Sequence, residues 1–427
     1  MRQPLGAGVT RLRLLNPLAA FLKAETSGAL VLLLATVAAL LWANSRWGDA
    51  YEALWRIELG IGLGEAGRIG FDLRHLVNDG LMTLFFLVVG LEIKRELAVG
   101  ELADRRKAML PFVAAVGGMV VPAAVYAAMN AGGPGERGWG IPVATDIAFA
   151  LGVLALLGRG LPGALRIFLL SLAITDDIGS IVVIAIFYSD SLQPGALLGA
   201  LALLSLVVLL WRTPRGVWRP VLIALSMAAT WVAVVASGVH PTIAGVALGL
   251  IAPVDGPAGT SPAERLERGL HPWTSYLVIP IFALANAGMR IDPGVLASSV
   301  SSPITLGIIL GLVAGKLFGV SAGAYIAVRA GIAVLPRGVR WSHIVGVAAV
   351  AGIGYTVSLF IADLSFGGTA AAVEAKMGVL FGSAIAAGLA AILLRLPKRA
   401  AASPLGRADD REVVHLPDRY VRKRPAM

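Results

Sequence analysis

The chain has 427 residues, of which 57% are hydrophobic and only 15% are charged, and it carries a formal net charge of +10. A soluble domain has about 25% charged residues and needs polar side chains to cover its surface. The composition therefore argues against a cytosolic enzyme, a disordered protein and a nucleic-acid-binding protein. It predicts a membrane protein that crosses the bilayer many times. Because there is no Cys, disulfides and thiolate-ligated metals are excluded.

In chain order, twelve apolar segments predict twelve transmembrane helices, since about 20 residues cross the hydrocarbon core and lipid satisfies no backbone group. The segments are 27–44, 75–93, 108–129, 139–157, 164–188, 195–211, 217–236, 239–252, 272–289, 303–329, 341–363 and 373–394. The eighth is short and is expected to tilt or to thin the bilayer. The predicted fold class is an all-α polytopic membrane protein. Its parts are an N-terminal segment (1–26), a membrane domain (27–394) and a basic tail (395–427).

The distribution of Lys and Arg predicts the orientation of these helices. With twelve spans both termini lie on one side, and that side carries 28 basic residues against 7 on the other. Cytoplasmic loops carry the excess of basic residues in membrane proteins. We therefore expect both termini in the cytoplasm and the protein in the cell (inner) membrane.

The first long external loop, about residues 56–73, has the pattern of a β-hairpin. Apolar residues alternate from Ile57 to Leu63 and again from Ile69 to Leu73, around a four-residue turn that contains Gly. Period-2 alternation around such a turn predicts two paired strands. An isolated hairpin is marginal in water, so this one either packs on its own protein or pairs with another chain.

Four ionisable residues lie far from the predicted membrane surfaces. Asp176 and Asp177 are at the middle of the fifth span, Lys316 is at the midpoint of the tenth, and Asp146 lies inside the fourth. A charge at mid-membrane costs at least about 2.5–3.5 kcal/mol on insertion scales. A structural ion pair or a misplaced span could explain one such charge. Two adjacent carboxylates with two further charges point to a functional site.

The two adjacent aspartates point about 100° apart on a helix, so only one of them can face Lys316 squarely while the other lines a cavity. Carboxylates in a low-dielectric site bind protons more tightly than in water, and two neighbouring ones titrate as a unit. A hard cation competes with protons for the same oxygens. Such a site can therefore exchange a cation for protons.

Two spans are predicted to be broken. The fourth contains Gly140 and Pro142, and the eleventh contains a Gly-rich stretch at 352–356. Gly and Pro weaken helices, and unwound backbone at membrane depth is tolerated only inside protein or beside water. The breaks lie in the middle of two three-span units, spans 3–5 and 10–12, which would be inverted repeats with the binding site between them. Asp146 would then compensate converging helix N-termini, and Lys316 converging C-termini.

Several stretches of this sequence resemble the NhaA-type sodium/proton antiporters, a family known for inverted repeats. The resemblance runs in order from about residue 16 to 394 and excludes the basic tail. The matching stretches are residues 85–97, 145–152, 173–179, 237–240, 270–273, 286–288, 315–316 and 352–356.

The resemblance implies a role for each matching residue. Asp177 would be the principal ligand of Na⁺, and Asp176 its partner, pairing with Lys316 and exchanging a proton. Thr145 and Asp146 would occupy the crossing of the broken helices. The family's second discontinuous helix matches Gly352, Gly354, Tyr355 and Thr356. Positions tied to pH response on the cytoplasmic side match Glu92, Arg95, Glu96, Glu267, His271 and His240.

The implied activity is electrogenic exchange of cytoplasmic Na⁺ or Li⁺ for external protons, activated at alkaline pH, with a role in sodium and pH homeostasis. The protein would be a secondary transporter rather than an enzyme, with no cofactor, and a homodimer through the external hairpin. Two departures from the family pattern bear on this. Thr175 stands where an aliphatic residue is usual, and Arg268 stands where a titratable His is familiar. Because Arg does not titrate, the pH threshold cannot be carried over.

Three other functions fit parts of the pattern. A transporter of another substrate, such as an organic anion, would favour exposed helix N-termini without a nearby acid, and Asp146 argues against it. An intramembrane aspartyl protease would need carboxylates on facing segments. A cation channel would need a ring of ligands. Proton movement on addition of Na⁺, Li⁺, K⁺ or organic anions to vesicles distinguishes these functions.

Overall fold

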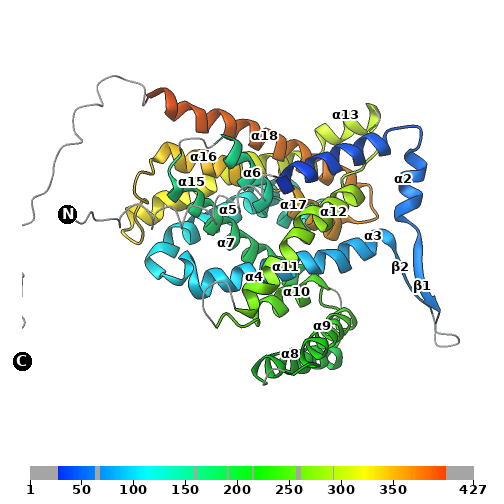
Figure 1. The fold of residues 1–427 in the computed structure, drawn as a ribbon. Helices are drawn as coiled ribbons and strands as arrows, with labels where there is room; N and C mark the ends of the chain where they lie inside the picture. The colour runs from blue at the N-terminus through cyan, green and yellow to red at the C-terminus, as the bar shows by residue number, and fades with distance from the viewer. Residues whose placement is uncertain are drawn as a thin grey trace, which may run out of the picture.

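The computed structural model describes residues 27–62, 68–157, 161–189, 192–213, 216–255, 261–291 and 293–400. Nearly all of these residues are helical (Figure 1). Two short strands form a β ribbon that projects at the end of the molecule opposite to the C-terminal end of the last helix (Figure 1). The predicted tail, 395–427, lies outside the described residues from position 401 onward.

After a first helix, Ser27–Ala43, the elements follow one another along the chain. They are α2 (Gly48–Trp55), β1 (Glu58–Gly62), β2 (Arg68–Asp72), α3 (Leu73–His75), η2 (Leu76–Leu81), α4 (Met82–Val99), η3 (Glu101–Ala103), α5 (Arg105–Asn130), η4 (Glu136–Val143), α6 (Ile147–Leu157), α7 (Gly163–Phe187), α8 (Pro194–Arg212), α9 (Arg219–Ala236), α10 (Thr242–Leu250), α11 (Pro262–Trp273), η5 (Thr274–Val278), α12 (Ile279–Asn286), α13 (Pro293–Ser301), α14 (Pro303–Leu310), η6 (Gly311–Gly315), α15 (Lys316–Arg329), α16 (Trp341–Ala351), α17 (Tyr355–Phe366) and α18 (Ala371–Ala400).

Seven helices in the described part of the chain are long and apolar enough to cross a membrane, and three bent helix pairs raise the number to ten if each pair is one span. The other two predicted spans, 239–252 and 272–289, fall on α10 and on η5 with α12. With nine residues, α10 reaches only about 14 Å, whereas the hydrocarbon core is about 30 Å thick. The structure thus supports a polytopic membrane protein, and the number twelve stays a prediction.

The β ribbon consists of β1 and β2, which pair antiparallel with Leu59 opposite Phe71. The turn between them, 63–67, lies outside the described residues. Ile57 and Leu59 are about half exposed, at 49% and 52%. The predicted strands are therefore present, and apolar side chains next to and within the ribbon face outward. The external location and the dimer contact are untested predictions.

Two groups of helices share one order: a continuous helix, a helix pair broken in the middle, and a second continuous helix. The first group is α5, η4 with α6, and α7; the second is α14 to α15, α16 with α17, and α18. The broken pairs bend by 41° and 42° respectively. This order agrees with two three-helix units, and their inverted relation remains a prediction.

Glycines let α5 approach α15 closely. A Cβ atom on Gly117 would lie 2.2 Å from the carbonyl oxygen of Gly319, and one on Gly323 would lie 2.5 Å from that of Val113. Because real Cβ atoms do not come so close, only Gly allows this backbone contact. The contact helps to hold Lys316, the first residue of α15, inside the protein, where it is fully buried.

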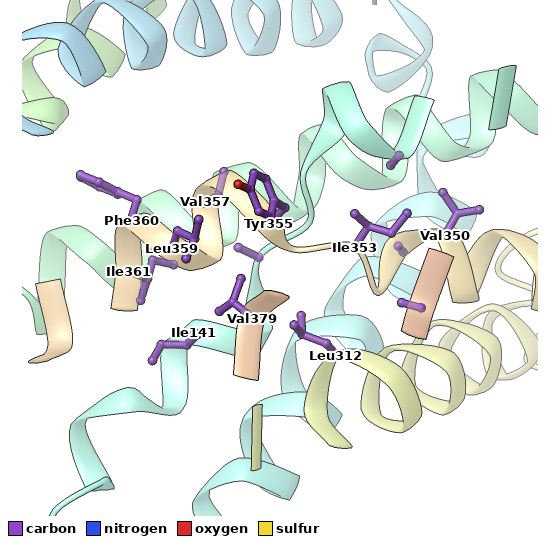
Figure 2. Close-up of a cluster of buried hydrophobic side chains, with 14 of the residues drawn as sticks. Ile141, Leu312, Val350, Ile353, Tyr355, Val357, Leu359, Phe360, Ile361 and Val379 are labelled. Atoms are coloured by element: carbon purple, nitrogen blue, oxygen red, sulfur yellow. The ribbon is translucent and has the colours of Figure 1, made fainter. Parts of the chain in front are cut away.

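The broken pair α16–α17 passes through the apolar core. Ile353, which lies in the break, and Leu312 of η6 are fully buried, and other buried apolar side chains gather around them (Figure 2). Residues 351–354 are all buried, so little of the unwound backbone is exposed to solvent. Its polar groups must therefore find partners within the protein.

Candidate functional site

The two breaks touch each other. Asp146 lies in the gap between η4 and α6, and its backbone N–H donates to the carbonyl oxygen of Ile353 at 2.7 Å. At Gly354 an added Cβ would lie 2.9 Å from the carbonyl oxygen of Ala144, so a glycine is needed for the approach. The broken segments therefore cross in direct backbone contact.

Asp146 caps both helices that begin at this crossing. Its Oδ1 accepts the backbone N–H of Phe149 in α6 at 3.0 Å. Its Oδ2 accepts both the backbone N–H and the hydroxyl of Thr356 in α17, at 3.0 and 2.6 Å. Helix N-termini carry partial positive charge and unpaired N–H groups, which a carboxylate satisfies. The expected compensation of converging N-termini by Asp146 is confirmed.

Lys316 pairs with Asp176 in a site from which solvent is fully excluded. Its Nζ also donates to Thr145 Oγ1 at 3.0 Å. That hydroxyl lies 2.6 Å from Asp176 Oδ2 and 2.8 Å from the carbonyl oxygen of Ala351, the last residue of α16. One hydroxyl proton can serve only one of these two acceptors at a time. Thr145 therefore links the lysine–aspartate pair to the negative C-terminal end of α16.

Asp177 faces different surroundings. It lies with Asp146, Glu92, His271 and Thr356 around a cavity of about 50 Å³. Only 4% of Asp177 is exposed, and its Oδ1 has no hydrogen-bond partner in the described part of the protein. The carboxylates of Asp176, Glu92 and Asp146 act on it more strongly than the ammonium of Lys316, which acts in the opposite direction. The cavity is therefore acidic and lined by oxygen atoms, which hard cations prefer.

Within the described ranges, no three His, Asp or Glu side chains converge closely enough to hold a metal ion. One water occupies about 10–15 Å³ of cavity volume, so the cavity of about 50 Å³ beside Asp177 has room for a small cation and a few waters. The carboxylates line this space without closing a cage around it.

The remaining residues of the predicted discontinuous helix pack around the crossing. The hydroxyl groups of Tyr355 and Thr36 make a hydrogen bond between α17 and the first helix. The ring of Tyr355 lies 5.6 Å from that of Phe149 in α6. Gly352 lies where a Cβ would come within 2.3 Å of the carbonyl oxygen of Leu312. These contacts fix the position of the crossing relative to its neighbours.

The structure distributes the predicted pH-response residues over two contacts at the C-terminal end of α4. Arg95 pairs with Glu267 of α11, whereas Glu96 accepts the backbone N–H of Glu101 at 2.9 Å and faces α7. Glu92 and His271 line the Asp177 cavity. Burial raises the pKa of Glu267 above its usual value, although the charge of Arg95 acts in the opposite direction.

The resemblance implies that His240 lies with these residues, but the structure places it elsewhere. Its Nε2 lies 3.7 Å from Asp79 Oδ1, at the start of the helix that continues into α4. Asp79 and Arg95 are separated by sixteen helical residues, or about 24 Å. The position of His240 in the sequence, just before the short α10, gave no indication of which end of α4 it contacts.

The two departures from the family pattern have different surroundings. The hydroxyl of Thr175 donates to the carbonyl oxygen of Ser171 at 2.7 Å, one turn earlier in α7. It therefore satisfies a backbone group of its own helix. Arg268 donates to the carbonyl oxygen of Glu264 at 3.3 Å within α11.

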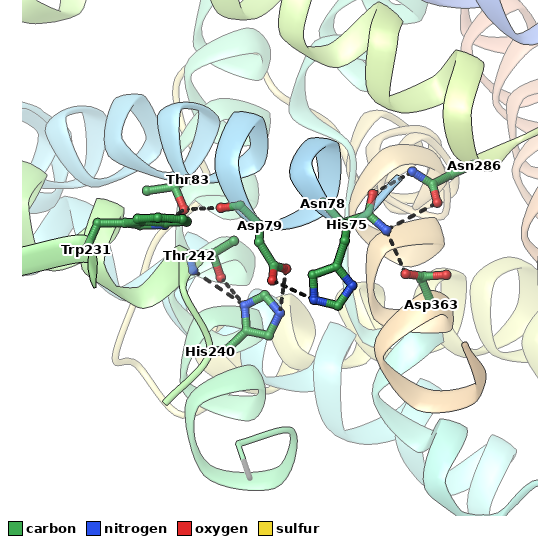
Figure 3. A network of polar contacts seen from close by, with 9 residues as sticks. All are labelled: His75, Asn78, Asp79, Thr83, Trp231, His240, Thr242, Asn286 and Asp363. Atoms are coloured by element: carbon green, nitrogen blue, oxygen red, sulfur yellow. Dashed lines mark hydrogen bonds and ion pairs between the residues drawn. The ribbon is translucent and has the colours of Figure 1, made fainter. Parts of the chain in front are cut away.

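Sequence reasoning missed a second polar network at the β-ribbon end of α4. Asn78 donates to Asp363 at 2.7 Å, and Asn286 donates to Asn78 at 2.7 Å (Figure 3). Lys376, buried in α18, interacts electrostatically with Asp363. Asp363 and Lys376 are ionisable residues near the ends of predicted spans. A search for charges at mid-span passes over such positions, although a buried Lys four residues into an apolar segment was a usable signal.

The helices are long and apolar enough to cross a membrane, and two broken pairs touch each other. Beside their contact lie a buried lysine–aspartate pair and an acidic cavity. This combination is typical of an ion-coupled secondary transporter. Residues 19–394 match the family described as Na⁺/H⁺ antiporter 1. The chain is 43% identical to the Na(+)/H(+) antiporter NhaA 3 of Frankia alni, over 88% of both chains. It is 47% identical to the Na(+)/H(+) antiporter NhaA 1 of Saccharopolyspora erythraea, over 88% of this chain and 90% of that one.

The Na(+)/H(+) antiporter NhaA of Rhodopirellula baltica is 43% identical, over 90% of this chain and 96% of its own length. The chain therefore belongs to the NhaA family of Na⁺/H⁺ antiporters. Na⁺ and H⁺ are the ions that this family of transporters exchanges, and the resemblance seen in the sequence is confirmed.

Proposed function

We propose that this protein exchanges one cytoplasmic Na⁺ or Li⁺ for two external protons, faster at alkaline pH, and so serves sodium and pH homeostasis. The observation that supports this is the contrast between two adjacent side chains. Asp176 is held through its Oδ2 by Lys316 and Thr145, whereas Asp177 lines an acidic cavity. Asp177 is the principal cation ligand, and Asp176 completes the site.

The two carboxylates give the cycle its stoichiometry. When Na⁺ arrives, Asp177 and Asp176 release their protons, and Lys316 pairs with the ionised Asp176. When protons return, Asp176 takes one and its bond to Lys316 is broken. The hydroxyl of Thr145 can then keep its bond to Ala351 at 2.8 Å. Two protons for one Na⁺ move one net charge, worth about 2.3 kcal/mol across 100 mV.

Alkaline activation follows from competition for the same oxygens. At low pH both carboxylates hold protons and Na⁺ cannot displace them, so the rate rises with pH. The Arg95–Glu267 pair sharpens this rise. Because burial raises the pKa of Glu267, its carboxyl ionises at a higher pH than an ordinary glutamate, and the ion pair between α4 and α11 strengthens over that interval. Glu92, Glu96 and His271 belong to the same cytoplasmic group.

The proposed orientation places both termini in the cytoplasm of a cell with the protein in its inner membrane. The β ribbon then lies outside and forms a homodimer contact through its free strand edges. In support, the ribbon and the C-terminal end of α18 are at opposite ends of the molecule (Figure 1). Deletion of residues 57–72 should weaken dimerisation and leave transport within each protomer intact. An unchanged mass in detergent would exclude the ribbon from the interface.

Purified protein in proteoliposomes tests the proposed exchange. A pH-sensitive dye and a membrane-potential dye are read together at several pH values while salts are added to one side. Na⁺ and Li⁺ should move protons and shift the potential, whereas K⁺ and organic anions should do neither. Proton movement without a change in potential would contradict the two-proton cycle. A response to organic anions alone would contradict Na⁺/H⁺ exchange.

A further inference from the structure

A second cavity of about 690 Å³ lies at the β-ribbon end of the molecule, and we name it the ribbon-side vestibule. Phe71, His75, Asp79, His240 and Asp363 are among the residues that line it. Asp79 of η2 lines this vestibule, and Glu92 of α4, further along the same run of helix, lines the Asp177 cavity. The vestibule is therefore distinct from the site described above.

Three titratable side chains form a continuous chain inside this vestibule. Asp79 Oδ2 lies 3.2 Å from His75 Nε2, and Asp79 Oδ1 lies 3.7 Å from His240 Nε2 (Figure 3). The side chain of His75 is 59% exposed and that of His240 only 9%. The chain thus leads from the open vestibule to a buried imidazole, through one carboxylate that contacts both rings.

The inner ring is held so that it can change its protonation state. His240 Nδ1 lies 2.8 Å from the hydroxyl of Thr242, which can donate to that nitrogen or accept from it. Both neutral tautomers and the imidazolium therefore keep the bond to the hydroxyl, whereas the longer bond from the backbone N–H of Thr242 to Nδ1, at 3.4 Å, is made only while Nδ1 is unprotonated. Nε2, on the other edge of the ring, remains directed at Asp79. The 3.7 Å separation must shorten by about 0.5–1 Å for transfer, as is usual for such contacts before a reaction.

The inner end of the chain meets the wall between the two cavities. The ring of His240 lies edge-on to that of Phe360, with centroids 5.3 Å apart, and Phe360 is fully buried. On α17, Val357 lines the Asp177 cavity and Leu364 lines the vestibule, so Phe360 lies between them. Phe86 packs against Phe360 from α4 at 5.6 Å. These rings form the apolar wall at which the chain ends.

We propose that His75, Asp79 and His240 form a proton relay that carries protons from the ribbon-side vestibule to the Phe360 wall. The proposal rests on the exchange activity and orientation given above. His75 takes a proton from water on Nδ1 and passes the proton on Nε2 to the Asp79 carboxylate. Asp79 then passes it to His240 Nε2 when that nitrogen carries its lone pair, and His240 ends as the imidazolium. Asp79 ends as it began, whereas His75 ends as its Nδ1–H tautomer and regains the Nε2–H form by exchanging protons with water in the vestibule.

The other charged groups that face the vestibule have structural partners instead. Asp72 accepts the backbone N–H of His75 at 2.6 Å and caps α3, and Asp363 accepts from Asn78 with Lys376 behind it. Arg74 donates to Glu52 at 3.4 Å, and Tyr188 donates to the carbonyl oxygen of Arg137 at 2.6 Å. Arg56, which also lines the cavity, does not titrate.

Right-side-out and inverted membrane vesicles that carry the full chain test the relay, because the pH on each side is set separately. Na⁺-dependent proton movement is measured against pH on the ribbon side for H75Q, D79N and H240Q. Each variant should raise the KM for protons on that side several-fold and keep the maximal rate. Imidazole added on the ribbon side should lower the KM for protons of H75Q toward that of the wild type, since it replaces the exposed ring. H75Q also guards against misfolding, because its side chain is mostly exposed.

D72N is the matched control. It removes a carboxylate that is outside the relay, and Asn still caps the helix. Because the Asp72 charge acts on His75 less than Asp79 does, the KM for protons of D72N should rise much less than that of the relay variants. An equal rise in KM for D72N, or a loss of rate at every pH without imidazole rescue, would overturn the relay. If the wild type exchanges ions and the three variants match it, only the relay is wrong. If the wild type shows no Na⁺-dependent proton movement, the proposed function itself is wrong.

Discussion

Near its midpoint, α7 carries two adjacent carboxylates, those of Asp176 and Asp177, which point to opposite kinds of surroundings. On one face, Asp176 meets a lysine ammonium and a threonine hydroxyl, and no solvent reaches it. On the other face, the next residue, Asp177, lines a small cavity that it shares with the carboxylates of Glu92 and Asp146. A rotation of about 100° along one helix is enough to separate these surroundings.

This difference distinguishes a carboxylate whose ionised form supports the fold through Lys316 from one that is open to a cavity and to a cation. A buried ion pair is costly to break from one side, because the remaining charge is left unpaired. A buried carboxylate without partners is instead a cost to the fold, which a cation or a proton relieves. Substitutions on the two faces should therefore act on different measurements.

The largest effect is expected for Asp177→Asn. The amide keeps the size of the side chain and removes the charge that attracts a hard cation. Na⁺-driven proton movement in proteoliposomes should fall below detection, while thermal stability stays equal to that of the wild type or rises. Near-normal exchange by this variant would exclude Asp177 as the principal ligand.

Lys316→Ala should act chiefly on stability, because it leaves Asp176 as a buried charge without its partner. Breaking such a pair from one side typically costs about 3–5 kcal/mol. The loss should be partly recovered when Asp176→Asn is added, and thermal unfolding of both single variants and the double variant measures the coupling. If the two losses simply add, the pair contributes no interaction energy.

Asp146→Ala removes the cap of two helices at once. Each lost cap costs about 0.5–2 kcal/mol, so the variant should lose about 1–4 kcal/mol. Asp146→Asn keeps one acceptor oxygen and should recover part of this. A thermal-stability series of the three proteins measures the effect, and equal stability of Ala and wild type would show that the caps do not contribute.

Glu267→Gln should have a smaller effect that depends on pH. Because burial raises the pKa of Glu267 above 4.5, its protonated form is favoured in the folded state. The stability that this provides is present at low pH and is lost as the pH rises through the raised pKa. Gln stays neutral, so melting curves at rising pH should fall less for the variant, and its alkaline activation should be less steep. Parallel curves for both proteins would contradict this assignment.

Thr175→Val should change least. The substitution removes one hydrogen bond to a backbone carbonyl, a contribution of about 1 kcal/mol, and keeps the shape of the side chain. Exchange rate and ion preference should match those of the wild type. A clear loss of Na⁺ affinity would instead place the Thr175 hydroxyl among the ligands.

Much of the site could be predicted from the sequence because charges in lipid are rare enough to stand out. The positions of Asp146, Asp176, Asp177 and Lys316 within apolar segments sufficed to expect that one aspartate meets the lysine and the other a cavity. The helical repeat gave the angle between the two aspartates. Gly and Pro in the fourth and eleventh spans indicated where the helices break.

Other features depend on tertiary contacts that periodicity does not encode. The end of α4 that His240 contacts follows from the packing of the short α10, which has no strong pattern of its own. The hydroxyl of Thr175 had two possible partners, and only the geometry of α7 distinguishes them. Asp363 and Lys376 lie near span ends, where a charge normally needs no explanation.

The carboxylate of Asp146 also has a mechanical consequence. Because one side chain fastens the first turns of α6 and α17 together, neither half-helix can tilt alone without tearing a hydrogen bond from the other. A displacement of α6 is therefore expected to displace α17 as well, and the reverse. The crossing should therefore move through the membrane as a single rigid piece.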